Sequence, residues 1–113
     1  MKYMMLLTRV DADWEALTDA ERNKETINQW WATQARAGHI VGGQELHTAR
    51  TATTIRWEGA TPIIVDGPFM EAKETIGGFG ILDVPDLDAA IAIAKTYPAP
   101  GHKVEIRPIV ERA

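Results

Sequence analysis

Three carboxylates and one ammonium group are concentrated in residues 66–74, in the sequence DGPFMEAKE. Two carboxylates that lie close together near an apolar sheet can raise the pKa of one of them, which then acts as a general acid or base near neutral pH. We therefore expect Asp66 to be the acid or base of a polar cleft, with Lys73 and Glu74 as its catalytic neighbours. The competing interpretation is structural: Asp66 accepts amide hydrogen bonds in a turn fixed by Pro68, and the charges after it form a solvated surface.

Four further residues are candidates for binding a ligand at this cleft, namely Arg56, Phe69, Glu71 and His47. Arg56 alternates with apolar neighbours on a predicted strand, so its guanidinium either points into the cleft, where it pairs with Asp66 or binds an anion, or stays on the surface. Phe69 can pin the turn to the core. Glu71 shares a face with Glu74 if this segment makes a helical turn.

The sequence predicts no metal or cofactor site. It contains no cysteine, which excludes thiolate nucleophiles and sulfur-ligated metals. His39, His47 and His102 lie in separate predicted elements with a spacing that matches no compact metal motif. We expect structural or surface roles for His39 and His102, and the same role is the alternative to ligand binding for His47. The glycine pairs at 42–43 and 77–78 do not follow the strand, loop and helix order of a phosphate cradle, and they indicate bulges or close backbone approach instead.

The chain that must position these residues alternates between patterns typical of strands and of helices. Thr18 and Glu21 match a capping box, which predicts a helix over 19–37 that ends at Gly38. A second, shorter helix is predicted over 87–96. The predicted strands comprise residues 3–8, 40–46, 51–57, 62–65, 78–84 and 103–107.

This order, β-α-β(ββ)-β-α-β, predicts an α+β domain with a ferredoxin-like split βαβ topology and an inserted β-hairpin. Both helices of such a fold lie on one face of the sheet. The strands at 3–8 and 78–84 are apolar on both faces, so the second face would leave an extended apolar patch in water. A second copy of the chain is the economical cover, and we expect a homodimer.

Composition narrows the class of partner. The chain has 113 residues and a formal net charge of -4, which opposes binding to a nucleic-acid backbone. Its apolar runs are shorter than the roughly 18 residues that cross a bilayer, and the apolar start of the chain reads as a buried strand. We expect a cytoplasmic protein that binds neither nucleic acid nor membrane directly.

Several strings along the chain resemble one known family. They are Met1-Lys2-Tyr3-Met4, Asp66-Gly67-Pro68-Phe69 with Glu71, Lys73-Glu74 and Gly77-Gly78, Pro85-Asp86-Leu87-Asp88-Ala89-Ala90, and Val104-Glu105-Ile106-Arg107-Pro108. In these strings the chain resembles the DGPF proteins, a branch of the YCII-related (YciI-like) domain family. The resemblance spans almost the whole chain, and it implies a single YCII-related (DGPF) domain over residues 1–113 with a dimeric α/β-barrel fold of the ferredoxin-like type.

The resemblance leaves two functions open. YciI-like relatives are suspected enzymes because of a His-Asp pair in a cleft, but Ile27 stands where the histidine of the first helix would align. A small-molecule enzyme or binding protein with a polar cleft around Asp66 is the first hypothesis. DGPF proteins also resemble components associated with extracytoplasmic-function sigma factors, which implies a non-catalytic regulatory or accessory module as the second. A cofactor-independent oxygenase would rest on fold analogy alone.

Overall fold

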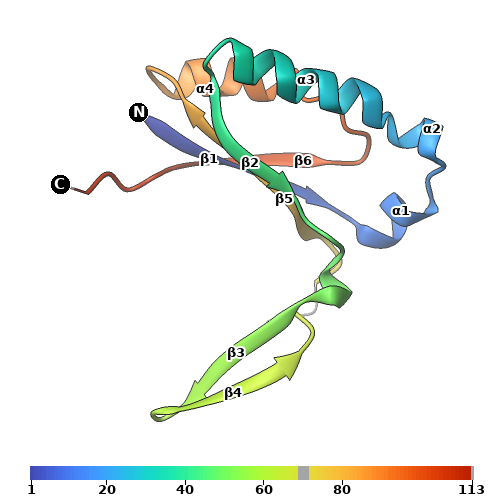
Figure 1. Ribbon diagram of the computed structural model, residues 1–113, viewed down its shortest axis with the longest axis vertical. Coiled ribbons are helices and arrows are strands. Elements are labelled where there is room, and N and C mark those ends of the chain that lie inside the picture. Colours follow the sequence, from blue (N-terminus) through green and yellow to red (C-terminus); the bar gives the residue numbers. More distant parts are fainter. Residues whose placement is uncertain (69–71, 113) are drawn as a thin grey trace.

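The computed structural model of the protein describes residues 1–68 and 72–112 (Figure 1). The strands are β1 (Lys2–Arg9), β2 (Ile40–Glu45), β3 (Thr53–Glu58), β4 (Thr61–Asp66), β5 (Thr75–Asp83) and β6 (Lys103–Pro108). The helices are α1 (Asp11–Ala16), α2 (Asp19–Arg22), α3 (Lys24–Arg36) and α4 (Leu87–Ala94), with a 3₁₀ turn η1 (Ala49–Thr51). None of the described helices is long and apolar enough to cross a membrane.

Four strands pair antiparallel in the order β2-β5-β1-β6, and β3 and β4 form a separate two-stranded sheet. The two crossover connections that contain α3 and α4 place β1 and β5 at the centre of the larger sheet, as the split βαβ topology requires. The predicted α+β class and the inserted hairpin are confirmed. Figure 1 shows both long helices on the same side of this sheet, while the hairpin extends away from it.

The start of the helical region differs from the prediction. The capping box is present, since the Thr18 hydroxyl accepts from the Glu21 amide at 3.2 Å and the Glu21 carboxylate accepts from the Thr18 amide at 2.9 Å. The single helix predicted over 19–37 is wrong, however, because Asn23 adopts a left-handed conformation with φ 59° and separates α2 from α3. Asparagine tolerates this conformation better than most residues. Gly38 ends the helical region with φ 78°, as predicted.

The starts of two strands also differ from the predicted positions by a few residues. The strand predicted over 51–57 begins only at Thr53, because residues 49–51 form the 3₁₀ turn. The strand predicted over 78–84 begins earlier, at Thr75. The polar stretch that follows β1 was not predicted as a helix but forms α1, with Asp11 and Asp13 in its first turn, where carboxylates favour the helix dipole.

The hydrophobic core lies between the helices and one face of the larger sheet. Alternate residues of β1 point into it, and Met5 is 0% exposed. From the helices, Trp30 packs into the core and its indole N–H donates to the Thr96 hydroxyl at 2.8 Å, which satisfies the one polar atom that it buries. The buried apolar residues are Tyr3, Met5, Leu7, Trp30, Ile40, Leu82, Val84 and Ala90.

The glycine pairs permit bulges and close packing, as the sequence indicated. Register shifts occur in β2 between Ile40 and Gly42 and in β1 between Leu7 and Thr8, opposite Gly77. A Cβ on Gly43 would lie 2.8 Å from the ring of Trp31 and 2.6 Å from the carbonyl oxygen of Phe79. The sheet is therefore bare of side chains where the Trp31 indole lies on it.

Candidate functional site

A cavity of about 220 Å³ lies between the larger sheet and the helical layer, at the end of β1. Four aromatic rings and two charged side chains contribute to its wall. They are Trp14, Trp31, Tyr97, His102, Arg9 and Glu45. The rings meet edge to face, with 4.9 Å between the centroids of Trp14 and His102 and 6.3 Å between those of Trp31 and Tyr97.

Arg9 is the charged centre of this cavity, and only 4% of it is exposed. Its Nε donates to the Asp11 carboxylate and its Nη2 donates to the Leu46 carbonyl, both at 3.2 Å. Burying a cation is costly unless it is paired and hydrogen-bonded, and these two partners meet that requirement. The guanidinium also lies 5.2 Å from the ring centroid of Trp14, within the range of a cation–π interaction.

Gly77 makes room for this arginine. A Cβ at position 77 would stand 2.7 Å from the Cζ and Nε atoms of Arg9. The extra residue in β5 opposite the Leu7/Thr8 step thus provides space for the guanidinium beside the sheet. Gly77, in the second glycine-rich segment, thus contributes to the site by leaving room for the Arg9 side chain.

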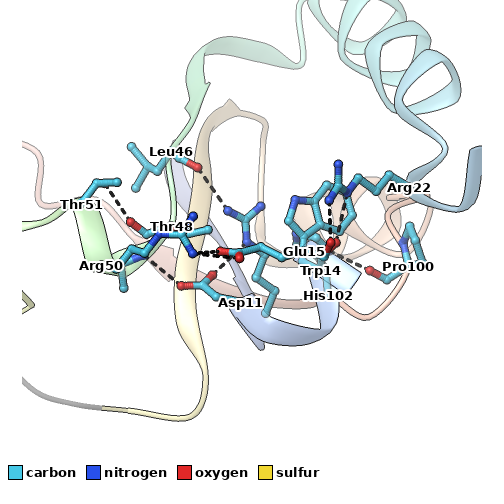
Figure 2. Close-up of polar contacts among 12 residues, drawn as sticks. Asp11, Trp14, Glu15, Arg22, Leu46, Thr48, Arg50, Thr51, Pro100 and His102 are labelled. Atoms are coloured by element: carbon cyan, nitrogen blue, oxygen red, sulfur yellow. Dashed lines mark hydrogen bonds and ion pairs between the residues drawn. The ribbon is translucent and has the colours of Figure 1, made fainter. Parts of the chain in front are cut away.

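Asp11 connects the arginine to the loop before the hairpin. Its second carboxylate oxygen accepts from the Ala49 amide at 2.9 Å (Figure 2). Partial burial disfavours the charged form, but the hydrogen bonds from Ala49 and Arg9 outweigh it and lower the pKa of Asp11 below its ordinary value. The carboxylate is therefore ionised at neutral pH, and it fixes the position of the guanidinium.

His102 contributes an imidazole to the wall of the cavity. Its burial, together with the positive charge of Arg9, lowers the pKa of His102 below 6.5. Its Nδ1 lies 3.0 Å from the Pro100 carbonyl oxygen, which can only accept. The neutral imidazole therefore carries its proton on Nδ1, and Nε2 is left as an acceptor. Figure 2 shows His102 beside Trp14 and Pro100.

Tyr97 and Arg22 also contribute to the charge and the geometry of the site. Burial and the negative charge of Glu45 raise the pKa of Tyr97 above 10.0, so its hydroxyl stays protonated at neutral pH. Arg22 donates to the backbone carbonyls of Trp14 and Glu15, both at 3.0 Å, and in this way fixes the end of α1 that carries Trp14 (Figure 2). The cavity thus combines a fixed cation, the Glu45 carboxylate, a neutral base and aromatic walls.

The residues nominated from the sequence lie elsewhere. Asp66 is exposed at the end of β4, and Arg56 is exposed on β3, where its guanidinium pairs with Glu58 at 2.8 Å. Of the nominated residues that the structure describes, His47 and Glu74 are brought together. They line an open groove of about 560 Å³ at the base of the hairpin, where Glu74 also pairs with Lys103 at 2.8 Å.

The remaining nominations do not join that group. Lys73 is exposed and lines neither the cavity nor the groove. Phe69 and Glu71 lie outside the described residues. The structure therefore places Asp66, Arg56 and Lys73 apart from the cavity between sheet and helices, which is where the sequence argument expected the cleft.

Arg9 was not among the residues nominated from the sequence, and His102 was expected to have a structural or surface role. In the structure Arg9 continues the alternation of buried residues along β1 and so lies on the core face of the strand, but the sequence does not reveal this face because residues 3–7 are all apolar. An arginine at such a position needs partners, and the glycine in the facing strand offers the space. His102 gave no local signal, since its neighbours in the cavity come from distant parts of the chain.

The topology and the cavity define a small α+β domain of the ferredoxin-like type with a cavity of about 220 Å³ between its layers. The family model of the YCII-related domain matches residues 1–112, and the chain belongs to that family. An uncharacterised protein of Rhizobium meliloti (strain 1021) is similar to it, with 30% identity over 84% of each chain.

Proposed function

We propose that the protein binds a small molecule with an anionic group and an unsaturated ring in the cavity around Arg9, and that His102 accepts a proton from this ligand. The observation that carries the proposal is a buried arginine in the wall of a cavity. Its Nη1 amino group donates to none of the described residues, so it is available to an anion.

The walls and the volume narrow the ligand class. Indole and phenol rings favour a flat, unsaturated partner that can meet them face to face or edge to face. A volume of about 220 Å³ is smaller than the range of roughly 300–1,000 Å³ typical of drug-sized ligands, which favours a small metabolite. Aromatic and unsaturated carboxylates combine these properties.

The chemistry supported by this arrangement is proton abstraction. A bond between the ligand and an acidic hydrogen breaks, a bond between that hydrogen and the Nε2 atom of His102 forms, and the electron pair stays on the ligand. Arg9 lines the same cavity, and its positive charge would stabilise the negative charge that develops on the ligand. Because the pKa of His102 is lowered, the imidazole is already neutral and able to act as a base at neutral pH.

A thermal-shift screen with small aromatic and unsaturated carboxylates tests this site. Compounds that raise the melting temperature of the wild type should lose this effect with Arg9→Gln and keep it with Arg56→Ala, a matched control on an exposed arginine. His102→Gln should retain binding and lose ligand turnover followed by NMR. Equal stabilisation of the wild type and a folded Arg9→Gln variant would contradict the proposal. Co-purification of an extracytoplasmic-function sigma factor with the wild type and with the Arg9→Gln variant would favour the regulatory alternative.

We also propose that the protein is a homodimer in which a second copy covers the open face of the larger sheet, forming the dimeric barrel expected from the resemblance. The register places Met4 and Leu6 of β1 beside Ile81 and Phe79 of β5 on that face, and all four are only partly buried. Sedimentation at micromolar concentration should give a dimer, which Leu6→Glu dissociates and Lys24→Glu, on the exposed start of α3, does not. A monomeric wild type would refute this.

A further inference from the structure

The hairpin of β3 and β4, which we call the arm (residues 53–66), has one apolar face without a cover. Its register places Ile55 opposite Ile64 and Trp57 opposite Pro62, so these four side chains lie on the same face. Trp57 is 64% exposed and Ile64 is 71% exposed. Figure 1 shows the arm extending away from the helices and the larger sheet. A tryptophan and two isoleucines are thus held together on a surface that this chain leaves in water.

The exposed area and the radius of gyration of the chain are larger than those of a compact monomer, and an assembly would bury the additional surface. A compact monomer of 12.5 kDa exposes about 6,200 Å², whereas this chain exposes 7815 Å². Its radius of gyration is 16.0 Å, compared with about 13 Å for a compact domain of this length. The surplus area is about twice the roughly 800 Å² that each partner contributes to a stable protein–protein interface. A second copy of the chain can therefore account for it.

An isolated two-stranded hairpin is marginally stable in water, so the arm needs a surface on which to pack. The groove at the base of the arm offers one of matching character. Leu46 is 42% exposed and Ile76 is 47% exposed in this groove, and Ala49, Ala52 and Pro68 add further apolar surface. Because the arm and the groove belong to the same chain, two copies can satisfy each other through a closed two-fold arrangement.

We infer that two copies of the protein exchange arms, and that each arm lays its face of Ile55, Trp57 and Ile64 into the groove of the second copy. The groove adjoins the cavity, because its Leu46 carbonyl accepts from Arg9 and its Ala49 amide donates to Asp11. The arm of one copy thereby holds the segment that positions the buried arginine of the other. This inference concerns assembly and does not depend on which ligand the cavity binds.

Paired variants test the exchange. Trp57→Glu and Ile76→Lys should each raise the dimer dissociation constant about 100-fold or more, since every substitution acts twice in a symmetric dimer. An equimolar mixture of the two variants should restore the dimer to within about tenfold of the wild type. In the mixed dimer one contact is unaltered, and the other brings together the two opposite charges. Thr61→Lys, on the opposite face of the arm, should leave the dissociation constant unchanged.

Hydrogen exchange on the wild-type protein gives an independent readout that needs no variant. Amides of residues 53–58, 61 and 63–66 should exchange slowly where the protein is dimeric and faster on dilution. A monomeric wild type with rapidly exchanging arm amides would overturn the inference. A dimer that persists in Trp57→Glu, or a mixture of folded variants that stays monomeric, would also overturn it, and in that case dissociation by Leu6→Glu alone would still support the sheet-face dimer.

Discussion

Gly43→Ala is the most direct test of how the sheet accommodates Trp31. The new Cβ would lie 2.6 Å from the Phe79 carbonyl oxygen and 2.8 Å from the indole, and real Cβ atoms essentially never come that close. The carbonyl belongs to the central strand β5 and cannot rotate aside, so the strands must separate or the indole must leave its place. Overpacking of this kind costs about 1–3 kcal/mol, and we expect a value near the upper end.

The adjacent glycine provides a matched control. A Cβ on Gly42 would contact only the Cδ1 atom of Ile81, at 3.6 Å, which is an ordinary van der Waals distance. Urea unfolding at equal protein concentration should therefore give a free energy of unfolding for Gly42→Ala within about 1 kcal/mol of the wild type. Gly43→Ala should melt several degrees lower, at roughly 4 °C per kcal/mol. Equal midpoints for the two variants would show that the close approach at Gly43 is not a constraint.

Three further changes probe other parts of the molecule. Met5→Ala should lower the free energy of unfolding by about 2–5 kcal/mol, because Met5 is 0% exposed, and a loss below 1 kcal/mol in urea unfolding would contradict this core. Thr18→Ala should cost about 1 kcal/mol by removing the capping box, and no change in the urea midpoint would show that the box contributes nothing. The pKa of His102 is lower in the folded state than its ordinary 6.5, so the free energy of unfolding should fall as the pH drops below 6.5 and level off below the folded pKa. Urea unfolding across this pH range should show a smaller dependence of this free energy on pH for His102→Gln than for the wild type.

Much of the fold was predictable because its signals are local. Thr18 with Glu21 marks a helix start, and Gly38 marks the end of the helical region. The apolar runs of β1 and β5 identify the central strands without any knowledge of their neighbours. Asn23 is the exception among the local features, since a left-handed asparagine inside a helical pattern has no distinctive sequence signal.

The candidate site was much less predictable, because it depends on partners far apart in the chain. Arg9 is buried only because Asp11, the Leu46 carbonyl and the space at Gly77 meet around it. No spacing rule relates these positions. The polar segment that begins at Asp66 looked richer in chemistry because its charges are adjacent in sequence, whereas the cavity obtains its charges from several elements.

The pairing pattern of the arm has a consequence for handling the protein. Each of its two strands has a neighbour on one side only, so both outer edges present backbone groups to which further chains can add. Pro62 removes one amide donor from β4, which interrupts such growth at one position. At high concentration, newly synthesised chains can therefore either associate in an ordered way or add strands to one another and form filaments. The yield of folded protein should then depend on how quickly another chain covers these edges.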